Sequence, residues 1–180
     1  MENKNELNLN AETEDILGLM KNYELVLKKL YELFAQKIPQ EKEFWLKLSE
    51  EESKHAYWLE ILDMNLKKQE VILDDDSVNA EAVKSSFSDV RKSIEYFNKA
   101  EIASEEALKL AVSLENHMIE QDFFQSSHGQ IKDFDQTMNL LREETLRHGE
   151  VLRQKLIDES GDKSDDKTES LFDKIKSIFK

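Results

Sequence analysis

The stretch LSEEESKHA, residues 48–56, places a carboxylate and an imidazole where a helix would be expected to carry apolar side chains. Glu52 and His55 are three residues apart, so on a helix their side chains lie on one face, one above the other. Buried groups of this kind are costly unless they are paired, hydrogen-bonded or bound to metal. The stretch therefore predicts a helix whose polar groups face partners on other helices. The apolar residues of the same face recur at steps of three and four and are Phe44, Leu48, Leu59, Leu62 and Leu66.

The composition is that of a helical domain with a heavily solvated surface. The 180 residues include 36% charged residues, one Pro and four Gly. A formal net charge of −14 argues against binding to nucleic acid, which requires clustered Lys and Arg. The chain has no Cys, which excludes disulfides, thiolate zinc sites and iron–sulfur centres. No apolar run reaches the length of a membrane span, and no targeting pattern opens the chain, so we expect a cytoplasmic protein.

Apolar periodicity predicts four long helices in a domain spanning residues 11–159. They run from about 11 to 37, 40 to 68, 104 to 126 and 130 to 159, with Ser104 as an N-cap and Gly129 as a C-cap candidate. The break at Pro39 is short and makes the first two helices antiparallel. A long connection with a lesser helix over 78–99 follows the second helix. The sequence therefore predicts an all-α, antiparallel four-helix bundle with one long crossover.

The two ends of the chain differ from this domain. Residues 1–10 are polar and predict a disordered N-terminal tail. Residues 160–168 predict a flexible linker, and residues 169–180 form an amphipathic segment too short for a stable isolated helix. Three docking sites for this segment are open: its own bundle, another subunit or the wall of a larger protein cage, and a membrane surface.

Each long helix carries polar residues within its apolar stripe, at matching depths. Glu24 precedes Pro39 by about as many residues as Glu52 follows it, and Glu115 precedes Gly129 much as the 144–148 region follows it. The four sets are therefore expected at one level of the bundle, where carboxylates and imidazoles can bind metal. The polar residues that interrupt the stripes at this level are Glu24, Glu52, His55, Glu115, Thr145 and His148.

This order of residues resembles the ferritin-like di-iron carboxylate proteins, and in particular the rubrerythrin-like branch without its cysteine-ligated iron domain. Residues 51–56, EESKHA, look like the most recognisable signature of that family, and the segments around Glu24 and Glu115 are similar to its first and third ligand segments. The likeness covers about residues 15–154. It implies a ferritin-like bundle and two bridged metals, with Glu52 and Glu115 bridging, Glu24 and Glu144 terminal, and one His on each metal.

The fourth helix departs from the family pattern. The family has Glu three residues before the histidine, and this chain has Thr145 there. Glu144, four residues before His148, can replace the absent ligand, since residues four apart share a face. It can equally point into solvent, which leaves a reduced or empty site. Both outcomes are open at this stage.

The resemblance implies a non-haem di-iron oxidoreductase that reduces peroxide or dioxygen or oxidises ferrous iron. Oxygen ligands with imidazole suit two irons per chain and also admit manganese or zinc. An external electron donor and a homo-oligomer are expected. The alternative is a ferritin-like bundle with a degenerate metal site, which acts as a binding or assembly module through its C-terminal segment.

Overall fold

The computed structural model describes residues 16–71, 73, 78–124 and 132–160, and every regular element in this part of the chain is helical. The all-α class expected from the sequence is confirmed. The predicted tail 1–10 and segment 169–180 lie outside the described residues, and of the predicted linker only Ser160 is described, as the last residue of a helix. The helices are α1 (Ile16–Lys37), η1 (Pro39–Glu41), α2 (Lys42–Lys68), α3 (Ala80–Lys99), α4 (Ser104–Glu120) and α5 (Lys132–Ser160).

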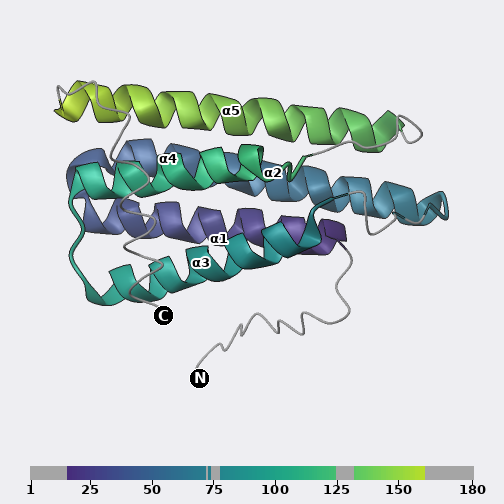
Figure 1. Ribbon diagram of the computed structural model, residues 1–180, viewed down its shortest axis with the longest axis horizontal. Helices are drawn as coiled ribbons and strands as arrows, with labels where there is room; N and C mark the ends of the chain where they lie inside the picture. The colour runs from purple at the N-terminus through teal and green to yellow at the C-terminus, as the bar shows by residue number, and fades with distance from the viewer. Residues whose placement is uncertain (1–15, 72, 74–77, 125–131, 161–180) are drawn as a thin grey trace.

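The helices form a bundle in which neighbours run along one another (Figure 1). The helix α1 packs against α2 and α3, α4 packs against α5, and α2 also contacts α5. Figure 1 shows α1 and α2 running in opposite directions, as the short turn at Pro39 predicts. The helix α3 carries the chain back along the bundle, so that α4 starts at the same end as α2. The lesser helix predicted over 78–99 is thus confirmed as α3.

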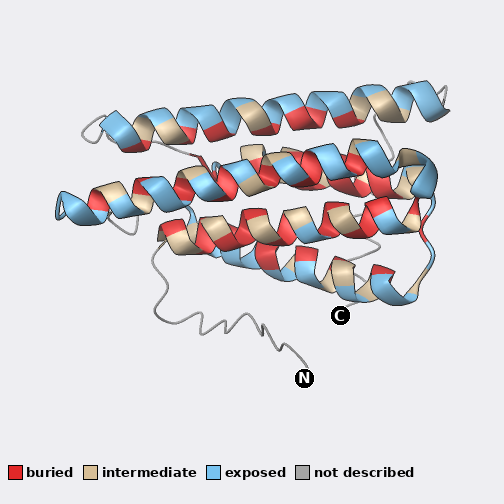
Figure 2. Ribbon diagram, turned by 180° about the vertical axis from the view of Figure 1, so that it is seen from behind, coloured by how far each residue is buried: buried red, intermediate tan, exposed pale blue. Residues whose placement is uncertain are grey.

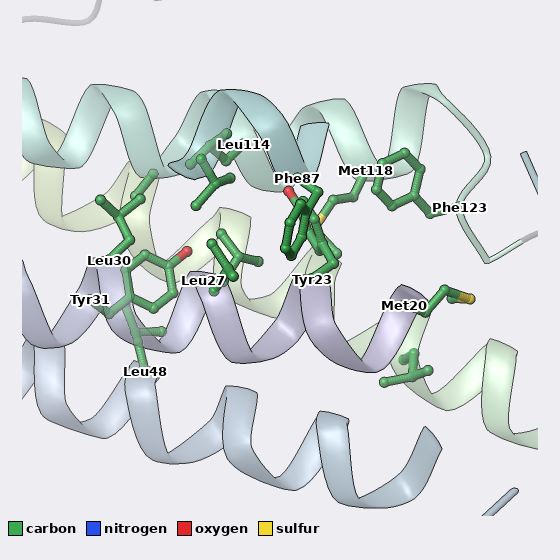
Figure 3. Close-up of a cluster of buried hydrophobic side chains, with 14 of the residues drawn as sticks. Met20, Tyr23, Leu27, Leu30, Tyr31, Leu48, Phe87, Leu114, Met118 and Phe123 are labelled. Atoms are coloured by element: carbon green, nitrogen blue, oxygen red, sulfur yellow. The ribbon is translucent and has the colours of Figure 1, made fainter. Parts of the chain in front are cut away.

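The core lies between the inward faces of the helices, where the buried residues gather (Figure 2). Burying one large apolar side chain contributes roughly 1.5–3 kcal/mol, so these stripes fix the rotation of each helix about its axis. Figure 3 shows Leu27, Tyr31 and Leu114 among the side chains of one such cluster. None of the helices in the described part of the chain is both long and apolar enough to cross a bilayer.

Two helices end in the same backbone motif without glycine. At the end of α4, Asp122 has a φ of 53°, and its amide donates to the carbonyl of Ile119 while the amide of Phe123 donates to that of Met118. After α2, Glu70 has a φ of 56°. Its amide donates to the carbonyl of Lys67, and the amide of Val71 donates to that of Leu66. These pairs of bonds satisfy the last carbonyls of each helix.

The boundaries of α4 therefore correct two expectations. The helix ends at Glu120, before the predicted end near Gly129, which lies outside the described residues. Ser104 was expected to be the N-cap, and this was wrong, because Ala103 occupies that position. The hydroxyl of Ser104 instead lies within hydrogen-bonding distance of the carboxylates of Glu41 and Glu159, to either of which its single proton can be donated, and so links the starts of α2 and α4 to the end of α5.

Candidate metal centre

The helix α2 contributes a buried carboxylate and a buried imidazole to the middle of the bundle. Glu52 is 1% exposed and His55 is 2% exposed. His55 Nδ1 lies 2.8 Å from Glu52 Oε2, as the spacing of three residues on a helix allows. The face predicted from the stretch 48–56 is therefore the buried face of α2.

The helix α1 places Glu24 beside His55. The carboxylate of Glu24 is fully buried, and its Oε2 lies 3.8 Å from His55 Nδ1. The short turn at Pro39 brings Glu24 and Glu52 to one depth, where both lie near His55. The number of residues between each of them and the turn predicted this.

The helices α4 and α5 complete the cluster from the other side. His148 Nδ1 lies 3.0 Å from Glu52 Oε1 and 3.5 Å from Oε1 of Glu115. The rings of His55 and His148 are stacked, with their centroids 5.2 Å apart. The structure thus brings together five of the six predicted ligands, from four different helices.

Three buried polar atoms of this cluster have no hydrogen-bond partner in the described part of the chain. They are Glu24 Oε2, Glu52 Oε1 and His148 Nδ1. Glu52 Oε1 and His148 Nδ1 are 3.0 Å apart, yet they are not aligned as donor and acceptor. Buried polar atoms without partners are rare, because each costs the full free energy of desolvation. Within the described residues, Glu52, His55 and His148 each offer a ligand atom, and these atoms lie within 4.8 Å of one another. The residues present therefore fit a metal ion.

Glu51 holds the far side of the His148 ring. Its Oε2 lies 3.0 Å from His148 Nε2, and Arg147 Nη2 lies 3.2 Å from the same oxygen. A proton on Nε2 then bonds to Glu51 and leaves Nδ1 to face the cluster, as in metal-binding histidines whose second nitrogen donates to a carboxylate. This role of Glu51 was not predicted from the sequence. The available signal was its position four residues before His55, which places the two residues on the same side of α2.

The structure places Glu144 away from the other five predicted ligands. Its Oε2 accepts a bond of 3.2 Å from Arg147 Nε, and its side chain is 28% exposed. Thr145 turns inward instead and is 2% exposed. The helix α5 therefore contributes His148 to the cluster, whereas its Glu144 pairs with Arg147.

The ionisation of the metal-free cluster follows from burial and from the pairing of its charges. Burial raises the pKa of Glu24 to about 8 against the opposing effect of His55. Burial also acts to raise the pKa of Glu52, but His148 and His55 outweigh it and lower this pKa to about 2.

The pKa values of the two histidines shift in the direction opposite to the effect of burial. Burial would lower the pKa of His55, but Glu24 and Glu52 raise it to about 10. For His148 burial is likewise outweighed, by Glu115 and Glu52, and its pKa rises to about 11. Protons on Glu24, His55 and His148 thus balance the buried carboxylates when no metal is bound.

Two tyrosines of α1 border the cluster. Tyr31 Oη donates a 2.6 Å hydrogen bond to Glu115 Oε1. Burial, followed by the charge of Glu115, raises the pKa of both Tyr23 and Tyr31 well above 10, so both hydroxyls stay protonated. Tyr31 therefore acts as a fixed donor that orients Glu115.

Comparison of the chain with protein-family models, with curated proteins and with solved structures finds no match. The assignment of a function therefore depends on the residues of the cluster.

Proposed function

We propose that the chain is a ferritin-like di-metal carboxylate protein of the rubrerythrin-related class, and that it reduces peroxide or dioxygen or oxidises ferrous iron with two irons in the buried cluster. The observation that carries the proposal is the set of buried atoms without hydrogen bonds, Glu24 Oε2, Glu52 Oε1 and His148 Nδ1, in one cluster with His55. Carboxylate oxygens with imidazole suit iron, and also manganese or zinc.

The position of Glu52 supports two metals rather than one. One of its oxygens faces His55 and the other faces His148, so a single carboxylate serves both histidines. Glu24 lies on the side of His55 and Glu115 on the side of His148. Glu52 is therefore the bridging ligand in our proposal, and the remaining groups are divided between the two positions.

The chain's own residues hold, orient and shield the centre. Tyr31 orients Glu115, and Glu51 with Arg147 orients His148. The surrounding apolar residues keep bulk water from the cluster, which strengthens every charge interaction within it. Non-haem iron supplies the exchange of electrons with dioxygen or peroxide when it is bound. Because these 180 residues contain no Cys, we expect the electrons to come from an external donor.

The course of the chain also supports a ferritin-like bundle. Such bundles have one long crossover between their second and third ligand-bearing helices. Here α3 lies between α2 and α4, and it packs against α1 outside the helices that carry the cluster. The ferritin-like arrangement is thus part of the proposal, as is a homo-oligomer.

A second candidate function is favoured by Thr145 and Glu144. Without a carboxylate from α5, the position beside His148 has fewer ligands than the family pattern implies. The second candidate is therefore a bundle with an incomplete metal site, which acts as a binding or assembly module through residues 169–180, on a protein cage or a membrane surface.

Metal analysis separates the two functions. The purified chain is loaded anaerobically with Fe(II), desalted and analysed for iron per chain, together with Glu144→Ala. About two irons per chain in both proteins supports the di-metal proposal. Absence of metal after separate trials with Fe(II), Mn(II) and Zn(II) overturns it. A loss of iron in Glu144→Ala alone would return Glu144 to the ligand set.

A further inference from the structure

A groove opens between α2 and the first half of α5. Its volume is about 510 Å³, within the range of roughly 300–1,000 Å³ that small-molecule sites occupy. Its lining consists of Tyr57, Trp58, Ile61, Leu62, Asn65, Asp133, Gln136, Thr137 and Leu140. None of these residues takes part in the metal cluster.

One wall of the groove is aromatic and aliphatic. Tyr57 is 59% exposed, Ile61 37% and Leu140 41%, so three large apolar side chains meet water in one place. Trp58, from the same turn of α2 as Tyr57, is half-buried. Rings stack favourably on rings in either offset or edge-to-face arrangements, so this wall suits a flat aromatic molecule.

The remaining lining selects among aromatic molecules. Asn65, Gln136 and Thr137 provide amide and hydroxyl groups, and Asp133 provides a carboxylate. The described lining holds no Lys, Arg or His, and the chain has a net charge of −14. An anion is therefore disfavoured, whereas an uncharged molecule with an O–H donor meets several acceptors.

Trp58 connects the groove to the buried cluster. The centroid of its ring lies 5.3 Å from that of His55. A molecule held against Trp58 is therefore separated from His55 by a single indole ring. No other residue named in the lining has a ring contact with the cluster among the contacts described.

From this geometry we propose that the groove between α2 and α5 binds a neutral aromatic compound of the phenol class. The ring lies against Tyr57, Trp58 and Leu140, and the hydroxyl bonds to the polar groups contributed by Asn65, Asp133 and Gln136. The site is separate from the metal cluster and does not depend on bound metal.

The test uses the metal-free chain labelled with ¹⁵N and 2-naphthol as the probe. The two Trp indole N–H signals are followed by nuclear magnetic resonance. Trp45 is fully buried, and its Nε1 donates a 3.1 Å bond to Glu41, so it is an internal control. The Trp58 signal should shift in a saturable manner while that of Trp45 stays in place, and the His55 ring signals should shift with Trp58.

Two matched comparisons make the test specific. The sulfonate of the same ring, 2-naphthalenesulfonate, should bind at least about tenfold more weakly because of its charge. Leu140→Glu should weaken 2-naphthol binding by about tenfold or more, since it places a charge in the apolar wall. Val151→Glu is the control, because Val151 is 40% exposed on the same helix and does not line the groove.

The proposal is overturned if the Trp58 signal does not move at saturating 2-naphthol, or if 2-naphthalenesulfonate binds as tightly as 2-naphthol. It is also overturned if Leu140→Glu and Val151→Glu change the affinity for 2-naphthol equally, or if the signals of groove residues shift with protein concentration rather than with ligand concentration. The last result would assign the groove to contact between two copies of the chain. Since no metal is present, failure here leaves the proposed metal centre standing, and failure of metal loading leaves the groove standing.

Discussion

The two halves of the buried cluster are built differently. In the His55 half, which consists of Glu24 and His55 with one oxygen of Glu52, α2 contributes both a carboxylate and the imidazole. In the His148 half, which consists of Glu115 and His148 with the other oxygen of Glu52, α5 contributes the imidazole but no carboxylate, and Thr145 is its buried residue three positions earlier.

The His148 half is instead held from outside. Glu51 and Arg147 fix the far side of the His148 ring, and Tyr31 fixes Glu115. A carboxylate of α2 thus holds His148, whose own helix contributes no carboxylate to the cluster. For the proposed di-metal centre, we therefore expect the two positions to differ in affinity.

The largest effect is expected for Glu52→Ala, which removes the only residue shared by both halves. Two buried histidines then lose a partner, and breaking a buried pair from one side costs about 3–5 kcal/mol. The free energy of unfolding of the metal-free chain, measured with urea, should fall accordingly, and binding at both metal positions should be lost. Glu50→Ala, at an exposed neighbouring residue, is the control. Retention of one metal by Glu52→Ala would show that the halves do not share a ligand.

The pH dependence of the metal-free chain should be asymmetric. A raised pKa contributes stability that is lost as the pH rises from the unfolded to the folded value. For Glu24 this interval is from 4.5 to about 8, and for His55 and His148 it begins at 6.5 and ends at about 10 and about 11. The lowered pKa of Glu52 acts in the other direction, with stability lost as the pH falls from 4.5 to about 2.

Stability should therefore be greatest near pH 4.5 and decline more on the alkaline side, where three groups contribute rather than one: Glu24 from pH 4.5 upward, and the two histidines from pH 6.5 upward. Urea unfolding as a function of pH measures this profile. Glu24→Gln should remove the decline between pH 4.5 and 6.5, where Glu24 contributes without the histidines. An unchanged profile in that variant would contradict the assignment, as would stability that increases up to pH 9.

A smaller effect is expected for Glu51→Gln, confined to one half. Loss of a carboxylate behind a metal-binding histidine typically costs about 10–100-fold in affinity. The position beside His148 has fewer ligands and should be the weaker of the two. Titration calorimetry with Mn(II) or Zn(II) should show this weaker binding event weakened further by Glu51→Gln, with the other event unchanged. Glu50→Gln should leave both unchanged. Equal weakening of both events would mean that Glu51 acts on the bundle as a whole and not on His148.

The smallest effect is expected next to His148 itself, for Gly149→Ala. A Cβ at this position would meet the side chains of Arg153 and Asn116 at 3.8 Å, an ordinary contact. Alanine should therefore stabilise the helix by about 0.5–1 kcal/mol without changing metal affinity. The midpoint of urea unfolding measures this. A lower free energy of unfolding would show that the His148 half depends on close packing against Gly149. A lower metal affinity in this variant would show the same.

The sequence predicted the helices and the depth of the cluster because both follow from local regularities. Apolar spacing fixes the inward face of each helix, and the short turn at Pro39 fixes the relative depth of Glu24 and Glu52. The end of α4 was missed because Asp122 adopts the left-handed conformation that usually indicates Gly.

The direction of Glu144 could not be read from spacing, and the spacing of Glu51 gives its side of α2 but not its partner His148. Glu144 and Thr145 are adjacent on α5 and point about 100° apart, so the rotation of that helix about its axis decides which one faces the core. Arg147, one turn further along, is a competing partner for Glu144 at the surface. Glu51 lies in a run of three glutamates, and only the docking of α5 beside it distinguishes it from its solvated neighbour Glu50.

The unequal origin of the halves has a consequence for how the protein is made. Glu24, Glu52 and His55 all lie in the first two helices, which are joined by a short turn, whereas the contact of His148 with Glu51 spans 97 residues. Local contacts form before distant ones, and synthesis proceeds from the N-terminus. The N-terminal hairpin therefore carries its share of the cluster well before His148 has been translated, and the docking of α5 encloses these polar side chains.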